Sequence, residues 1–121
     1  MSIPRSRTNK QLAQYRPSAT AAIVIYSSPE AISYTNLKTI IICNAHTSAV
    51  TYQIFHDDDG EVLDLDSALF YNVSIAANST EIISLPDPGI TISGYSVGSL
   101  GVRASVVDVL TFTLYGQEVT I

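Results

Sequence analysis

With 121 residues, the chain is long enough for one domain with its own hydrophobic core and too short for two ordinary domains. Hydrophobic residues make up 46% of it and charged residues 14%, so we expect a surface rich in Ser and Thr, a surface buried against partners, or both. The net charge of −5 is unevenly divided, because the first sixteen residues hold four basic and no acidic side chains (+4), whereas the remainder holds two basic and eleven acidic ones (−9).

Several classes of protein are excluded by what the sequence lacks. The single Cys43 excludes an internal disulfide and a metal site made of cysteines alone. No apolar run reaches the ~18 residues of a membrane helix, and the N-terminus lacks the apolar core of a signal peptide. We therefore expect a protein that makes no membrane contact and is made and kept in a cytoplasm, or assembled there into something larger.

The first twenty residues predict an extended basic arm. They hold few large apolar side chains, and Pro4 and Pro17 limit any helix between them. Such a segment buries too little apolar surface to offset the entropy of ordering it, so we expect it to order only on a partner. The expected organisation is therefore an arm over residues 1–20 and a domain over residues 21–121.

The rest of the chain consists of short β-branched and aromatic runs separated by turn residues, a pattern typical of strands. The expected strands are residues 21–26, 37–44, 49–55, 69–75, 80–85, one or two within 90–100, 102–107 and 110–115. About eight short strands with a turn signal every ~8–12 residues fit a single antiparallel β-sandwich of jelly-roll type. The sequence therefore predicts an all-β fold.

Alternation within the strands predicts which side chains reach the surface. The stretch 37–44 is apolar on both faces, so it is expected to be a central strand buried on both faces or a strand with one face in a subunit contact. In 69–75, Leu69 and Tyr71 are expected to point inward together with Val73 and Ile75. The residues predicted to make subunit contacts are Ile40, Ile42, Phe55 and Phe70.

The acidic stretch after the third expected strand is a candidate cation site. Carboxylates are ligands that calcium prefers, and the weak candidates are Asp57, Asp59, Asp64 and Asp66. The EF-hand spacing fails, because taking Gly60 as its turn glycine puts Phe55 at the first ligand position. A solvated acidic loop is therefore the preferred interpretation, with a calcium site or a metal-dependent enzyme as alternatives.

No catalytic motif is present. The sequence holds no nucleophile elbow and no Gly-rich phosphate loop before a helix. His46 and His56 lack further ligands at metal-like spacing. We therefore expect no enzyme activity and no cofactor.

The basic arm has three interpretations: a contact with nucleic acid, a contact with an acidic protein surface, or a solubilising tail. Its candidate partner-binding residues are Arg5, Arg7, Lys10, Tyr15 and Arg16. Four charges with only one aromatic residue among them provide no stacking platforms for bases. A protein partner is therefore favoured over direct binding of nucleic acid.

Three segments carry a resemblance to a known group of proteins. They are the stretch IIICNAHTSAVTYQIFHDDDG, the hairpin ALFYNVSIAANSTEIISL and the terminal LTFTLYGQEVTI, preceded by an arm that contains LAQYRP. Together they resemble small virion structural proteins of tailed bacteriophages, in which such an arm leads into a β-domain with a "CN" strand end and a closing "YGxE" strand. These motifs are structural, so the resemblance implies a class of protein and no reaction.

Within that class, the resemblance favours a capsid cement (decoration) protein. Such proteins form homotrimers at the local three-fold axes of an expanded shell and use arms to tie capsomers together, which implies the major capsid protein as partner and the capsid surface as location. A head-to-tail, collar or tail-fibre-base component is the nearest alternative. A carbohydrate-binding β-sandwich is a more remote one, because exposed tyrosines suit it but the absence of tryptophan counts against it.

Overall fold

The computed structural model describes residues 6–29, 34–94 and 97–120. The elements in chain order are β1 (Ser6–Tyr15), β2 (Ile23–Ser27), β3 (Tyr34–Asn44), β4 (Val50–Asp57), the 3₁₀ turn η1 (Leu65–Ser67), β5 (Ala68–Ile75), β6 (Thr80–Ser84), β7 (Ile90–Ser93), β8 (Ser99–Ala104) and β9 (Leu110–Thr120). None of these elements is a helix long and apolar enough to span a membrane.

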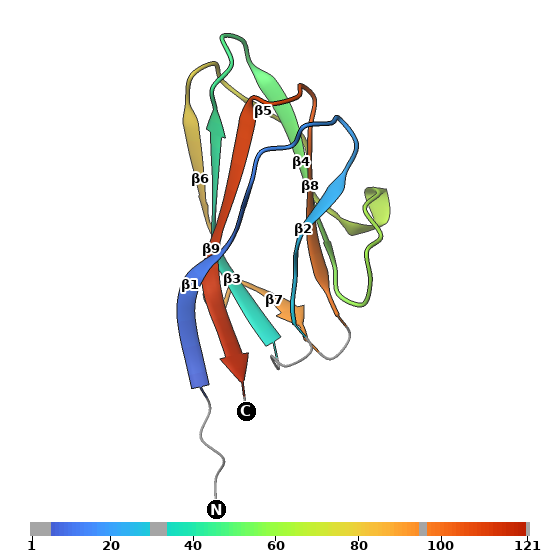
Figure 1. Ribbon diagram of the computed structural model, residues 1–121, viewed down its shortest axis with the longest axis vertical. Coiled ribbons are helices and arrows are strands. Elements are labelled where there is room, and N and C mark those ends of the chain that lie inside the picture. Colours follow the sequence, from blue (N-terminus) through green and yellow to red (C-terminus); the bar gives the residue numbers. More distant parts are fainter. Residues whose placement is uncertain (1–5, 30–33, 95–96, 121) are drawn as a thin grey trace, which may run out of the picture.

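The strands form two antiparallel sheets that face each other (Figure 1). Sheet A has the order β1-β9-β3-β6, with β7 also paired to β3, and sheet B has the order β2-β8-β4-β5. The chain crosses between the sheets six times, staying within one sheet only from β4 to β5 and from β6 to β7. This wrapping is that of a jelly roll, so the predicted all-β sandwich is confirmed.

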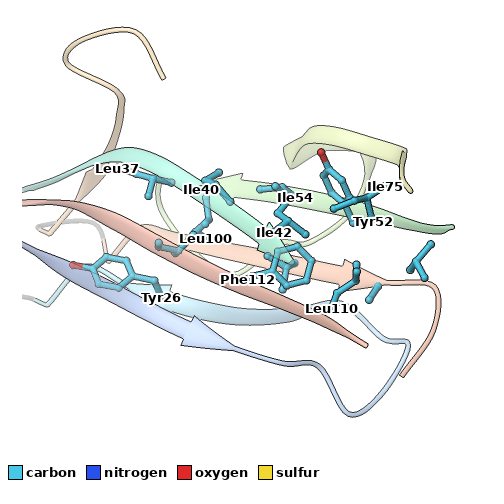
Figure 2. Close-up of a cluster of buried hydrophobic side chains, with 14 of the residues drawn as sticks. Tyr26, Leu37, Ile40, Ile42, Tyr52, Ile54, Ile75, Leu100, Leu110 and Phe112 are labelled. Atoms are coloured by element: carbon cyan, nitrogen blue, oxygen red, sulfur yellow. The ribbon is translucent and has the colours of Figure 1, made fainter. Parts of the chain in front are cut away.

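Aliphatic and aromatic side chains from both sheets form one core between them (Figure 2). The side chains of Ile40, Ile42 and Leu114 from sheet A are fully buried there with Ile54 and Val102 from sheet B. Full burial of such a side chain stabilises the fold by about 1.5–3 kcal/mol. The rings of Tyr52 and Phe112 meet edge to face across the core at 6.3 Å between centroids.

A bulge in β3 decides which of its side chains point inward. The pairing with β9 runs from Leu37 opposite Gly116 to Thr39 opposite Tyr115, so Lys38 is an extra residue. Leu37 and Ile40, three positions apart, therefore share the inner face, and the alternation expected over 37–44 is corrected. A side chain at Gly116 would place its Cβ 2.2 Å from the carbonyl oxygen of Asn36, so this approach requires glycine.

Bulges in β5 have the same effect on the opposite sheet. Val73 pairs with Tyr52 and Phe70 with Ile54, so β5 has one more residue than β4 between these pairs. Asn72, in this interval, has a φ of 53°. Val73 and Phe70 both pack against the core, whereas Leu69 and Tyr71 are exposed. The prediction that Leu69 and Tyr71 point inward is therefore wrong.

The N-terminal segment belongs to the sandwich over most of its length. Ser6–Tyr15 is an edge strand of sheet A that pairs with β9 from Thr120 to Phe112. Leu12 and Ala13 pack against the core, and Pro17 is buried. This corrects the expected arm and the boundary after residue 20, because a polar edge strand needs only one partner strand and a few apolar contacts to be held.

Candidate functional site

The residues predicted to bind a partner through the arm are spread along the edge of sheet A. Arg5 lies outside the described residues. Arg7 donates to the side chain of Gln117 at 3.4 Å, and Lys10 pairs with the Glu118 carboxylate at 3.2 Å. Tyr15 is half-buried and Arg16 is exposed just after the strand. Arg7 and Lys10 therefore contact their own chain, and among the four described residues only Arg16 is an exposed side chain beyond the strand.

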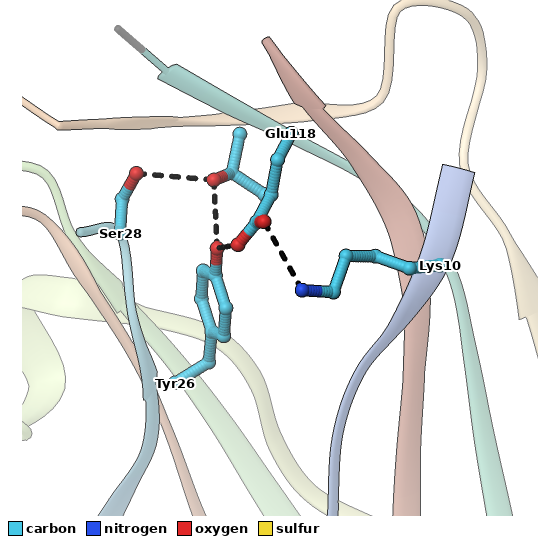
Figure 3. A network of polar contacts seen from close by, with 5 residues as sticks. Lys10, Tyr26, Ser28 and Glu118 are labelled. Atoms are coloured by element: carbon cyan, nitrogen blue, oxygen red, sulfur yellow. Dashed lines mark hydrogen bonds and ion pairs between the residues drawn. The ribbon is translucent and has the colours of Figure 1, made fainter. Parts of the chain in front are cut away.

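Lys10 is part of a polar cluster that ties β1 to the sandwich (Figure 3). The hydroxyl of Tyr26 donates to the Glu118 carboxylate at 2.7 Å and lies 2.8 Å from the hydroxyl of Thr35, which is 3.0 Å from that of Ser28. Burial raises the pKa of Tyr26, so its hydroxyl stays protonated and serves as a donor. The cluster links β1, β2, β3 and β9.

The side chains predicted for subunit contacts lie inside the molecule. Ile40 and Ile42 are fully buried between the sheets and Phe70 packs against the same core. Phe55 is 2% exposed and lies on the outer side of sheet B, under the connection between β4 and β5. The expected contact through these four residues is therefore corrected: the two bulges place Ile40, Ile42 and Phe70 on the inner faces, and the β4–β5 connection covers Phe55.

Nine uncharged side chains face outward on three strands of sheet A, with Lys10 and Lys38 beside Tyr115 at one end of this face. The nine are Thr39, Ile41 and Cys43 on β3, Thr80, Ile82 and Ser84 on β6, and Thr111, Thr113 and Tyr115 on β9. Ile82 is 64% exposed and Tyr115 is 41% exposed. The free thiol of Cys43 is also exposed. This sheet A face is thus the open, uncharged surface of an acidic molecule.

The acidic stretch is organised by hydrogen bonds to its own backbone. The Asp57 carboxylate accepts from the backbone amides of Val62 at 2.8 Å and Asp59 at 3.3 Å, and these bonds lower its pKa, the Val62 bond most. Asp64 caps η1 by accepting from the amide of Asp66 at 2.9 Å. Among the described residues, no three His, Cys, Asp or Glu side chains are grouped so that they could hold a metal ion.

His56 precedes this stretch at the end of β4. Its Nε2 atom is buried, lies 3.8 Å from the Asp58 carboxylate and has no hydrogen-bond partner within the described part of the chain. Burial lowers the pKa of His56, and the neighbouring Asp58 and Asp57 oppose that effect only in part. The imidazole is therefore favoured in its neutral form.

A pocket of about 480 Å³ lies on the outer side of sheet B, and we call it the loop pocket. The residues that line it come from β4, β5, β8, the β4–β5 connection and the segment before β2: Ala22, Gln53, Phe55, Leu63, Asp64, Leu65, Tyr71 and Arg103. Leu63 packs over Gly101 of the sheet, where an added Cβ would lie 2.5 Å from its methyl group. The amino-acid sequence does not predict this pocket, because the bulge that turns Tyr71 outward has no sequence signature beyond Asn72.

No family model and no curated protein matches the chain. Among solved structures it is similar to the coat protein of tobacco streak virus, with 12% identity over 100% of this chain and 90% of the coat protein and a TM-score of 0.47. A structure of that coat protein as a dimer gives 11% identity over 99% of this chain and 88% of the coat protein, with a TM-score of 0.43. A structure of infectious bursal disease virus, Gx strain, gives 10% identity over 98% of this chain and a TM-score of 0.43; the chain spans about a third (32%) of that protein's length.

Proposed function

We propose that the chain is a structural protein of a virion and that, within this class, it is a capsid cement protein of a tailed bacteriophage. It binds the major capsid protein at the surface of the expanded shell and does so as a homotrimer. The proposal starts from the resemblance of three segments and of the LAQYRP stretch to such virion proteins. The observation that carries it is the sheet A face.

The sheet A face suits a protein that is packed between other proteins. Its central residue Ile41 lies between Ile82 and Thr113 on the neighbouring strands, so β-branched side chains run across three strands. Burying a charged group against a partner costs free energy, whereas burying an apolar side chain does not. An uncharged face with exposed apolar side chains is therefore the part of an acidic protein that is buried against a partner at the lowest cost. A flat sheet also offers its whole outer surface to one partner, as a lattice of capsid subunits requires.

Binding to phage heads tests the proposal. Purified protein is mixed with expanded and with unexpanded heads of the phage that encodes it, and the bound copies are counted after sedimentation. We expect saturable binding to expanded heads only. Co-purification with tails or collars and no binding to heads would favour the head-to-tail, collar or fibre-base alternative and overturn the cement proposal.

Two variants test the surface that is used. Ile82→Lys introduces a charge into the sheet A face at a side chain that is 64% exposed, so the fold is retained while head binding weakens at least tenfold. Val62→Lys, on the β4–β5 connection, changes a 51% exposed side chain and serves as the matched control. Equal binding by both variants would show that the sheet A face is not the contact.

The arm has to be tested with a shorter deletion than the expected boundary suggests. Removing residues 1–16 would remove β1 and the Lys10–Glu118 ion pair, so loss of binding would only report loss of structure. Removing residues 1–5 keeps every described contact. If the arm holds capsid subunits, this deletion weakens head binding and leaves the melting temperature unchanged; unchanged binding would restrict the contact to the sandwich.

A further inference from the structure

The loop pocket has an apolar floor and a rim of polar groups. Phe55 is 2% exposed and lines it together with Leu63 and Ala22, so the floor is made of packed hydrophobic side chains. The volume of about 480 Å³ lies within the ~300–1,000 Å³ typical of small-molecule sites. Its position on sheet B is across the sandwich from the sheet A face, so it is independent of the proposed capsid contact.

Neighbouring groups hold the polar side chains of the pocket in place. Gln53, which is 5% exposed, donates through Nε2 to the side-chain oxygen of Asn72 at 2.7 Å. Arg103 lies beside it on β8 and donates through Nε to the carbonyl oxygen of Thr20 at 2.6 Å. Asp64 is fixed by the bond from the Asp66 amide. The side chains are therefore oriented before a ligand arrives, which lowers the entropic cost of binding.

These bonds leave part of two of these groups unused. Within the described residues, no hydrogen bond is made by the amide oxygen of Gln53 or by the terminal guanidinium nitrogens of Arg103. The Arg103 nitrogens donate, whereas the Gln53 oxygen accepts. The pocket thus presents unused donors and acceptors around an apolar floor.

Tyr71 supplies an aromatic ring at the same pocket. It is 49% exposed because the bulge at Asn72 turns it away from the core. The face of an aromatic ring is negative, so it attracts hydrogen atoms bound to carbon next to oxygen. The exposed Leu65, which also lines the pocket, adds apolar surface.

We propose that the loop pocket binds a neutral pyranose unit of a glycan. A pyranose presents hydroxyls that both donate and accept, and it has an apolar face of C–H groups that can lie on Tyr71. The charges of Asp64 and Arg103 balance within the pocket, which favours a ligand without net charge. The exposed Asp58, Asp59 and Glu61 on the adjoining connection disfavour sialylated or phosphorylated sugars.

The proposal is tested with the full chain on an array of neutral and anionic oligosaccharides, followed by titration of the best ligand. We expect binding to neutral glycans at micromolar to millimolar Kd, weakened at least tenfold by Tyr71→Ala and by Gln53→Leu. Tyr115→Ala, on the sheet A face, is the matched control and should leave the affinity unchanged. The melting temperatures of all variants show whether each is folded.

Three results would overturn it. They are an absence of binding to every neutral glycan at millimolar concentration, a preference for anionic glycans, and equal affinity of folded Tyr71→Ala and wild-type protein. Capsid binding is measured separately with the same proteins. Because Tyr71 lies outside the sheet A face, Tyr71→Ala should still bind expanded heads, so failure of the glycan proposal and failure of the cement proposal are distinguishable.

Discussion

The outer faces of the two sheets differ in what covers them. On sheet A, the nine outward side chains of the sheet A face on β3, β6 and β9 are uncharged, and Lys10 and Lys38 border them beside Tyr115. Sheet B is covered by the acidic β4–β5 connection (Figure 1). Leu63 of this connection packs onto Gly101. The difference assigns two kinds of contact to one small domain, a broad protein contact on sheet A and a small concave site on sheet B.

Glycine allows a close approach on each sheet, and the neighbouring atoms differ. At Gly116 an added Cβ would meet the backbone carbonyl oxygen of Asn36 at 2.2 Å, whereas at Gly101 it would first meet the methyl groups of Leu63 at 2.5 and 2.7 Å. Backbone atoms within a sheet move only if strand pairing moves with them, but a leucine side chain can rotate. Substitutions at the two glycines therefore allow the rigidity of the strand pairing in sheet A to be compared with that of the β4–β5 connection that covers sheet B.

Gly116→Ala should have the largest effect. The new methyl group forces β3 away from β9 next to the bulge at Lys38, so we expect a loss of about 3 kcal/mol, at the upper end of values for overpacking. Urea denaturation measures it. Gly60→Ala is the control, because its Cβ would meet only the flexible carboxylate of Asp57, at 3.1 Å. A loss below about 0.5 kcal/mol for Gly116→Ala would show that the two strands are not held so closely.

Tyr26→Phe should have the next largest effect, because it removes the hydroxyl that joins Glu118 and Thr35 inside sheet A. Loss of a buried hydrogen bond to a carboxylate costs about 1–2 kcal/mol. Tyr115→Phe, on the outer face of the same sheet, removes only a 3.4 Å bond to Gln11 and should leave the stability unchanged. Equal effects of the two substitutions would mean that the cluster does not hold β1.

The sequence predicts the fold class because alternation and turn residues are local. The strand over 80–85 is found close to its expected bounds, and the strand over 110–115 begins where expected but extends to Thr120. The strand over 102–107 is found as β8, shifted by about three residues. The pattern of β-branched runs between turns of Pro, Gly and Asn predicts a jelly-roll sandwich. These features depend on neighbouring residues alone.

The positions of the surface side chains depend on pairing between distant strands. The extra residue Lys38 is a bulge only because Gly116, far along the chain, allows β3 to approach β9. A period of two counted along one strand reverses at such a point, so Ile40 was placed outside and Tyr71 inside. The loop pocket could not be predicted for the same reason.

The third prediction concerns Gly101→Ala, which tests how firmly the β4–β5 connection is held on sheet B. The added methyl displaces Leu63 but no strand-pairing atoms except the Ile23 carbonyl oxygen at 3.1 Å, so we expect a loss of about 1 kcal/mol, smaller than for Gly116→Ala. Hydrogen exchange should show faster exchange of the Val62 amide, which is bonded to Asp57. A loss as large as that of Gly116→Ala would mean that the connection is as rigid as the sheet.

The smallest expected effect is a pH dependence of stability that arises from His56, where β4 leads into the β4–β5 connection. His56 has a lowered pKa in the folded chain, so between its unfolded pKa of about 6.5 and its lower folded pKa the unfolded chain binds more protons. Stability should therefore fall as the pH falls from 7.5 to 5.5. His56→Gln should reduce this slope; the slopes come from urea denaturation at each pH. A slope that persists in His56→Gln would assign it to other groups, and one of opposite sign would show that the attraction of Asp57 and Asp58 outweighs the burial of the imidazole.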